Sequence, residues 1–371
     1  MKVKNPFITT GYAGSDYFCD REQEAQTMVD ALENGRNITL LAPRRMGKTG
    51  LILNSFERLQ ARGYKTIYVD AFPAQNLQEF TQIFAGAVFN GLESGLERAL
   101  QSAKEFLKSC RPTITIDPSD GKPVFSFEVA QSQAEATLAD VFGYLKSRKE
   151  RVVVGIDEFQ QIALFPEKGV EATLRSHIQF TPGVGFVFAG SRQHLMREMF
   201  MSSKRPFYQS TQRMNLGVID EAAYYEFASR HFGLAKMTLK KDVFRWIYDR
   251  VDGITWYMQV MLNRIYALGE AEPTIDDALK VEKQIIGENG YDYRSLVETL
   301  PEGSVRLLRA MAHSGVVKSP MAGELIAKYG LNAPSSVATA LERLEDQEFV
   351  SESEAGYVVY DRFFARWLSA E

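Results

Sequence analysis

The amino-acid sequence predicts an α/β core with a parallel sheet, an all-α region after it, and a winged helix-turn-helix at the C-terminus. Strand and helix signals alternate in the first part of the chain, which is the pattern of an open α/β sheet. Strand signals stop after about Leu216, and the final segment runs helix, helix, turn, helix and hairpin. We therefore expect three domains, at about 1–216, 217–300 and 301–371.

The elements of the core follow from the spacing of apolar residues. Two runs, Arg151–Asp157 and Gly185–Gly190, are almost wholly apolar, as in strands buried on both faces. Polar turn residues between two alternating segments predict a hairpin insertion at about 111–130. The other expected core elements are a helix at Glu22–Asn34, a strand at Asn37–Ala42, a helix at Thr49–Ala61, a strand at Lys65–Asp70, a helical stretch from Asn76 to about Leu107 and a helix near Ala134–Arg148.

The elements after the core follow from amphipathic spacing. We expect Trp256 and Tyr257 in the core of the helical region, and the aromatic residues of Asp361–Leu368 packed against the wing rather than exposed for docking. The expected helices are Glu221–His231, Lys241–Val251, Thr255–Leu268, Ile275–Ile286, Ser304–His313, Met321–Tyr329 and Ser335–Asp346, and the expected hairpin is Phe349–Tyr360.

Composition and charge exclude several classes of protein. The 371 residues are 45% hydrophobic and 24% charged, which is ordinary for a chain that buries a sizeable core. A formal net charge of -4 provides no overall positive field for nucleic acid or an anionic membrane. The cysteines and histidines lack metal-ligand spacing, so we expect neither a disulfide framework nor a structural metal. No segment resembles a signal peptide or a membrane span, and we expect a cytoplasmic protein.

The strongest chemical signal is the segment from Ala42 to Thr49, between a predicted strand and a predicted helix. It fits the phosphate-loop pattern GxxxxGK[ST] except at Ala42, which is tolerable if φ there is negative. In such a loop Lys48 reaches the β- and γ-phosphates, and the hydroxyl of Thr49 is a ligand of Mg²⁺. The expected nucleotide contacts of this loop are Pro43, Arg44, Arg45, Met46, Gly47, Lys48, Thr49 and Gly50.

A second signal is a buried strand that ends in two carboxylates, Asp157 and Glu158. Asp157 at the carboxyl end of the strand can hold the Mg²⁺ shell, and Glu158 can orient and deprotonate an attacking water. The alternative without a function is a strand that happens to end in acidic residues at the surface. The phosphate loop upstream favours a nucleotide site.

Three further residues are open to two interpretations. Ser191 follows the Gly185–Gly190 strand, where the expected roles, which can hold together, are a sensor of the water or the γ-phosphate and the N-cap of the next helix. Arg44 and Arg45 either sense a phosphate or a neighbouring subunit, or pair with surface acids.

These motifs resemble the AAA+/STAND class of ATPases, in particular the archaeal-type ATPase family and its branch common in Bacteroidetes. The resemblance rests on Asn5-Pro-Phe with Gly11-Tyr12, Tyr17-Phe-Cys-Asp-Arg-Glu22, Pro43–Thr49, Ile156–Gln161, Phe188–Ser191 and Arg205–Ser210. It implies a nucleotide-binding core, a helical lid and a C-terminal winged helix, with ATP as the nucleotide. It also implies that Tyr17, Phe18 and Arg21 lie near the base and the sugar.

Two departures from the family pattern limit what carries over. Relatives often have Gly-Arg where this chain has Gln209-Ser210, so a trans-acting arginine does not carry over, and Arg205 and Arg213 are the nearby substitutes. Relatives also place a Gly-x-Pro element in the lid, where this chain has Gly253-Ile-Thr255. Coupling of the lid to the nucleotide through a proline therefore does not carry over.

The charges of the winged helix disfavour DNA. Phosphate contacts require lysine and arginine on the recognition helix and the wing. From Pro334 to Gly356 the one base is Arg343. The acids there are Glu342, Glu345, Asp346, Glu348, Glu352 and Glu354. A protein partner is therefore expected for this domain.

The sequence thus predicts a slow, Mg²⁺-dependent ATPase that acts as a nucleotide-driven switch. Glu158, Lys48 and Ser191 are the expected catalytic residues, with Arg205 or Arg213 as the arginine, and Thr49 and Asp157 hold the metal. Two alternatives stay open: a nearly inert nucleotide-binding interaction module and a DNA-associated ATPase. An oligomer that forms only with nucleotide is also open.

Overall fold

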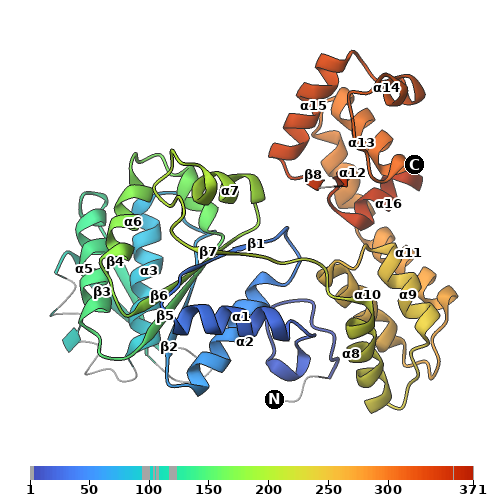
Figure 1. The fold of residues 1–371 in the computed structure, drawn as a ribbon. Helices are drawn as coiled ribbons and strands as arrows, with labels where there is room; N and C mark the ends of the chain where they lie inside the picture. Colours follow the sequence, from blue (N-terminus) through green and yellow to red (C-terminus); the bar gives the residue numbers. More distant parts are fainter. Residues whose placement is uncertain are drawn as a thin grey trace. The chain divides into compact units, whose positions relative to one another are not determined.

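A computed structural model gives the fold of the chain (Figure 1) and describes residues 4–93, 101–102, 105, 108–116, 123–353 and 355–370. The chain divides into two compact units. The first unit consists of Met1–Phe227 and Ile254–Trp256, and the second of Ala228–Gly253 and Tyr257–Glu371. Among the described residues, every helix is too short or too polar to span a bilayer.

The first unit is built on a five-stranded sheet with the order β2-β5-β6-β1-β7, in which all neighbours are parallel. The strands are β1 (Ile38–Leu41), β2 (Lys65–Asp70), β5 (Val152–Asp157), β6 (Val184–Gly190) and β7 (Gln212–Asn215). This confirms the predicted parallel α/β core, although β7 was not predicted. Because β6 lies between β1 and β5, the segments that follow these three strands meet at one edge of the sheet.

Helices cover both faces of this sheet (Figure 1). Val152, Val154 and Ile156 of β5 pack into one cluster, whereas Val153 packs into the other. One face is covered by α1 (Glu22–Glu33) and α2 (Lys48–Ala61), and the other by α3 (Leu77–Leu92), α5 (Ala134–Ser147), α6 (Val170–Gln179) and α7 (Gln193–Met201). The short helices η1 (Ser15–Tyr17), η2 (Gln131–Gln133) and η3 (Phe159–Leu164) connect these elements.

A hairpin of β3 (Cys110–Ile116) and β4 (Pro123–Val129) packs beside α3. Phe125, Phe127 and Val129 of β4 are buried in the core. The predicted turn at Asp117–Gly121 lies outside the described residues, as does most of the helical stretch predicted between the end of α3 and Leu107.

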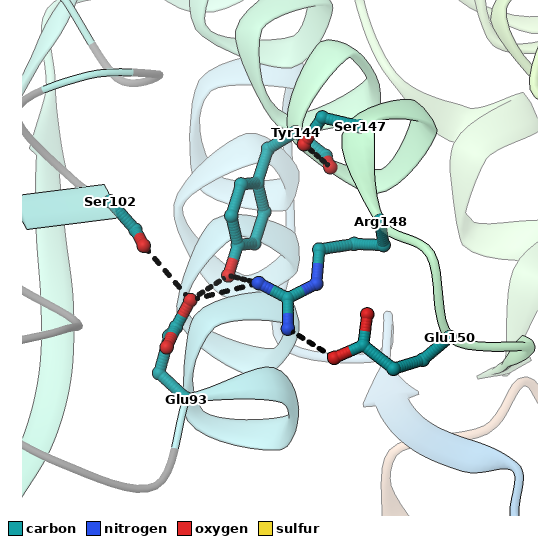
Figure 2. Close-up of polar contacts among 6 residues, drawn as sticks. All are labelled: Glu93, Ser102, Tyr144, Ser147, Arg148 and Glu150. Atoms are coloured by element: carbon teal, nitrogen blue, oxygen red, sulfur yellow. Dashed lines mark hydrogen bonds and ion pairs between the residues drawn. The ribbon is translucent and has the colours of Figure 1, made fainter.

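A partly buried polar cluster connects the end of α3 to the end of α5 (Figure 2). The carboxylate of Glu93, with a side chain 6% exposed, accepts hydrogen bonds from Ser102 Oγ at 2.9 Å, from Arg148 Nη1 at 3.1 Å and from the Tyr144 hydroxyl. Arg148 also pairs with Glu150 at 2.6 Å. Burial, and then the hydrogen bond to Glu93, raises the pKa of Tyr144, so the phenol remains a donor.

The second unit contains the helical region and the winged helix. Its helices and strands, with α8 shared between the units and α10 beginning in the first, are α8 (Glu221–Leu234), α9 (Lys241–Arg250), α10 (Thr255–Leu268), α11 (Ile275–Glu288), α12 (Gly290–Glu298), α13 (Glu302–Ser314), α14 (Gly323–Tyr329), α15 (Pro334–Asp346), β8 (Val350–Ser353), β9 (Gly356–Val359) and α16 (Arg362–Ala370). The antiparallel pair β8-β9 follows α15, which confirms the predicted winged helix.

The closing helix α16 faces inward, as its aromatic spacing predicts. Phe364 and Trp367 are 2% and 8% exposed, and both rings pack against Tyr293 of α12. The ring of Phe363 meets Tyr257 of α10 edge-on, with 5.2 Å between centroids. The winged helix and the helical region therefore share one core.

Candidate functional site

The phosphate-loop segment joins β1 to α2. Gly47 has φ +88° and Arg45 has φ +67°, so the loop turns through two left-handed residues, whereas Ala42 is not among the residues with positive φ. The change from glycine at Ala42 is therefore compatible with the backbone. Lys48 begins α2, and its Nζ donates to the carbonyl oxygens of Ala42 and Pro43 at 3.2 and 3.0 Å. The amides of the first helical turn face this loop.

Asp157 lies at the carboxyl end of β5 with two hydroxyl donors on one oxygen. Thr49 Oγ1 donates to Asp157 Oδ2 at 2.6 Å, and Tyr68 Oη donates to the same oxygen at 2.9 Å. Asp157 is 3% exposed. Burial, followed by the charge of Asp157, raises the pKa of Tyr68, which keeps the phenol protonated. The predicted metal residues Thr49 and Asp157 are thus in direct contact.

Tyr68 was missed by the sequence reasoning, and so was Asp70 of the same strand. The register of β2 and β5 pairs Asp70 with Asp157. Burial raises the pKa of Asp70, its hydrogen bond from Phe72 opposes this, and the charges of Asp157 and Glu158 raise it further. The available signal was the polar residues in the strand that comes next in the chain after the phosphate loop and its helix.

Glu158 is held by neighbours on two sides of the site. Its backbone is left-handed, with φ +51°, and its Oε2 accepts from Gln160 Nε2 at 2.5 Å and from Ser191 Oγ at 2.8 Å. Burial would raise the pKa of Glu158, but these two hydrogen bonds and the charge of Lys48 outweigh it, so the pKa is lowered. The Glu158 carboxylate is therefore ionised at neutral pH.

Ser191 lies at the end of β6, between the loop and the acids. It is 9% exposed, and its hydroxyl contacts Glu158. The N-cap of α7 is Arg192, with no side-chain cap, so the alternative reading of Ser191 as the helix cap is wrong.

The segment Tyr17–Arg21 packs beside the start of α2. A Cβ added at Gly50 would lie 2.9 Å from Cε2 of Phe18, so the Phe18 ring covers the first turn of α2. Arg21 is 4% exposed and donates to the carbonyl oxygens of Gly217 at 2.6 Å and Met46 at 3.5 Å. Tyr17 is half-buried at the end of η1.

Trp256 was predicted in the core of the helical region, and this is wrong. It belongs to the first unit, where its ring lies under the Arg45 guanidinium, 4.2 Å from the ring centroid. Its backbone N–H donates to Arg45 O at 3.0 Å, and Thr255 Oγ1 donates to Met46 O at 3.3 Å. Helical spacing did not reveal that α10 begins on the phosphate loop. Tyr257 is fully buried, as predicted.

The remaining arginines are less directly connected to the site. Arg205 pairs with Glu171 of α6 at 3.1 Å and Glu198 of α7 at 3.2 Å. Arg213 lies exposed on the edge strand β7, opposite Thr39 in the register of β1. Neither is brought to Glu158 by a hydrogen bond in the described part of the chain, and Arg44 is exposed. Their roles stay predictions.

The loop, the acids and the C-terminal domain together define a phosphate-loop ATPase with a winged helix, and comparison with known proteins agrees. Residues 18–261 match the model of an ATPase domain predominantly from Archaea, and residues 291–370 match a probable winged helix domain. The chain belongs to this archaeal-type ATPase family. Comparison with curated protein sequences gives no match.

Solved structures with the same fold cover almost the whole chain. A Walker-type ATPase of Pyrococcus abyssi aligns with a TM-score of 0.66 and 19% identity over 98% of this chain and 99% of its own. The ORC2 protein of Aeropyrum pernix, in ADPNP and ADP complexes, aligns with a TM-score of 0.59 and 16% identity over 100% and 98%. The ORC1 protein of the same organism, in complex with DNA, gives 0.55 and 14% over 99% and 97%.

Proposed function

We propose that this chain is a slow, Mg²⁺-dependent ATPase that works as a nucleotide-driven switch. The observation that carries the proposal is the contact of Thr49 with Asp157 beside Glu158. A hydroxyl and a carboxylate that meet at 2.6 Å, next to an ionised glutamate and a phosphate loop, are the set that phosphoryl transfer to water requires.

The oxygen atoms at this point fit a magnesium ion. Adjacent ligands of octahedral Mg²⁺, at 2.0–2.1 Å from the metal, lie about 2.9 Å apart. Thr49 Oγ1 and Asp157 Oδ2 are already 2.6 Å apart, so a small displacement would accommodate the ion through the Thr49 hydroxyl or through a water on Asp157. When bound, the ion would neutralise charge on the phosphates.

Lys48 and Glu158 have complementary tasks in this proposal. The Lys48 ammonium now donates to two loop carbonyls, and phosphate oxygens are stronger acceptors that would replace them. Glu158 is ionised and so able to take a proton from water. Gln160 and Ser191 both donate to its Oε2, and donors to a carboxylate weaken it as a proton acceptor, which favours slow turnover.

The test is ATP turnover with and without Mg²⁺. Glu158→Gln is expected to lower turnover by about 100-fold or more while nucleotide binding is retained, and Lys48→Ala is expected to weaken binding itself. Glu135→Gln, an exposed carboxylate on α5, is the matched control. Full turnover by Glu158→Gln would contradict the assignment. Nucleotide binding without turnover by the native chain would favour the inert interaction module instead.

Two neighbouring residues of α10 support the switch. Trp256 is attached to the phosphate loop in the first unit, whereas the Tyr257 ring packs on Phe363 of α16 in the second. A change in the conformation of the phosphate loop on nucleotide binding would therefore be transmitted from Trp256 to its chain neighbour Tyr257, and from Tyr257 to α16. Hydrogen exchange tests this: ATP added to Glu158→Gln is expected to change exchange both at 254–258 and at 362–368. An effect confined to the first peptide would contradict the switch.

We propose a protein, rather than DNA, as the partner of the winged helix. The exposed charges on α15 are Glu342, Arg343 and Asp346, so the helix presents more acid than base. A basic protein surface matches this pattern. Filter binding of duplex DNA at two salt concentrations tests the alternative, since salt-sensitive binding at low salt would favour DNA. Reversing the charge of Glu342 and Asp346 is expected to abolish capture of the protein partner.

A further inference from the structure

Tyr68 reaches the metal side of the site from a strand that carries no motif. The strand β2 lies at the edge of the sheet, and the Tyr68 ring packs on the face of the sheet that α2 covers. The hydroxyl crosses to the neighbouring strand β5 and meets Asp157 Oδ2 at 2.9 Å. Tyr68 therefore belongs to the same hydrogen-bonded group as Thr49.

The three hydrogen bonds on Asp157 leave its carboxylate little freedom. Oδ2 accepts from Tyr68 and Thr49, and Oδ1 accepts from the backbone N–H of Glu158 at 2.9 Å. A hydroxyl has one proton and two lone pairs. While the Thr49 hydroxyl donates its hydrogen bond to Asp157, the lone pairs of that hydroxyl remain available to a metal. The direction in which they point depends on where Asp157 Oδ2 is held.

We propose that Tyr68 is a positioning residue for the Mg²⁺ ligands of the proposed ATPase site. By donating to Asp157, it fixes the carboxylate that orients the Thr49 hydroxyl toward the metal. The proposal rests on the proposed function, because it assigns Tyr68 to the metal half of that site. Outer-shell donors of this kind commonly change metal affinity by 10- to 100-fold.

The test compares Tyr68→Phe with Tyr64→Phe. Tyr64 directly precedes β2, is 7% exposed, and its hydroxyl accepts from Arg151 Nη1 at 3.2 Å, so its loss probes the strand without touching Asp157. The Mg²⁺ concentration for half-maximal turnover at saturating ATP is expected to rise about tenfold in Tyr68→Phe and to match the native chain in Tyr64→Phe. Nucleotide affinity measured in EDTA is expected to be unchanged in both.

A double-mutant cycle separates positioning from a structural role. In an Asp157→Asn background, Tyr68→Phe is expected to cause no further change in the Mg²⁺ midpoint, because the carboxylate it orients is gone. An unchanged midpoint in Tyr68→Phe, or an equal loss of nucleotide affinity with and without Mg²⁺, would overturn the proposal. So would failure of Tyr68→Phe to fold while Tyr64→Phe folds.

The failure of the proposed function is a different result. If the native chain binds a non-hydrolysable ATP analogue more tightly with Mg²⁺ but shows no turnover, hydrolysis is refuted. The Mg²⁺ concentration for half-maximal analogue binding is then compared between Tyr68→Phe and Tyr64→Phe in the same way. Binding by the native chain that is indifferent to Mg²⁺ would overturn the role of Tyr68.

Discussion

The Ser191 hydroxyl donates a hydrogen bond to the Glu158 carboxylate, with 2.8 Å between Oγ and Oε2. Gln160 donates to the same oxygen at 2.5 Å. Donors that stabilise the ionised form of a carboxylate also weaken it as a proton acceptor. The residues that keep Glu158 charged therefore also lower its basicity, and a change in either donor alters both properties together.

Ser191→Ala is expected to shift the acidic limb of turnover to higher pH. The pKa of Glu158 is lowered in the folded protein in part by this hydroxyl, so its removal lets the pKa rise and the base becomes protonated at a higher pH. The measurement is the pH profile of ATP turnover, with Ser202→Ala as a control outside the site. A limb that stays in place or moves to lower pH would show that Ser191 does not act on Glu158.

Glu171→Gln is expected to be at least as stable as the native chain at neutral pH. Burial raises the pKa of Glu171, with Arg205 lowering it and Glu198 raising it, and its buried Oε2 has no hydrogen-bond partner among the residues that the structure describes. A raised pKa means that the folded state holds the proton more tightly, so the ionised carboxylate lowers the free energy of unfolding at neutral pH. Arg205 keeps its second partner, Glu198.

Denaturant unfolding at a series of pH values measures this effect. The native chain is expected to gain stability relative to Glu171→Gln as pH falls through the raised pKa toward the unfolded value of about 4.3, below which the difference is constant. A variant that is clearly less stable at neutral pH would mean that the pair with Arg205 outweighs the burial of the charge.

Gly190→Ala is expected to lower the free energy of unfolding by about 1–3 kcal/mol, because the end of β6 has no room for a methyl group. A Cβ there would lie 2.1 Å from Gln160 Oε1 and 2.7 Å from Met196 Cγ. Removing this clash requires the Gln160 side chain to move. Because Gln160 donates a hydrogen bond to Glu158, the variant is also expected to alter turnover. Chemical denaturation gives the first value. Gly143→Ala is the control, since α5 has open space there and alanine favours helix by up to about 1 kcal/mol.

Tyr144→Phe is expected to lower the free energy of unfolding by about 1–3 kcal/mol, because a buried carboxylate loses a donor. The Glu93 side chain is 6% exposed and keeps Ser102 and Arg148 as partners (Figure 2). Thermal or denaturant unfolding measures the loss, and Tyr291→Phe, at 82% exposure, is expected to be neutral. An equal response of the two variants would show that the Tyr144 hydroxyl stabilises the fold no more than an exposed tyrosine hydroxyl does.

The local part of the site was predictable from the sequence, since each motif is a short segment with its own signal. The phosphate loop and the pair Asp157 and Glu158 follow strands that are mostly apolar, and parallel strands bring their ends to one edge. The winged helix was predictable for the same reason, because its helices and hairpin are contiguous in the chain.

The contacts between distant segments were not predictable. Tyr68 contacts Asp157 because β2 pairs with β5. The spacing of apolar residues does not predict the order of strands in a sheet. The helical spacing around Trp256 suggests a residue in the core of the helical region. Its backbone N–H, however, lies in the first turn of α10, where it has no acceptor within the helix, and it donates to a carbonyl oxygen of the phosphate loop instead. Only the tertiary arrangement distinguishes the two environments.

The separation of Thr49 from Asp157 along the chain has a consequence for biosynthesis. The two residues are 108 positions apart. They can meet only after β5 has paired with β6 and β6 has paired with β1, the strand that precedes the phosphate loop. Parallel strands with long crossovers pair late in folding, because chain entropy is lost before the contacts repay it. A nascent chain therefore exposes its phosphate loop on the ribosome long before Thr49 and Asp157 can meet.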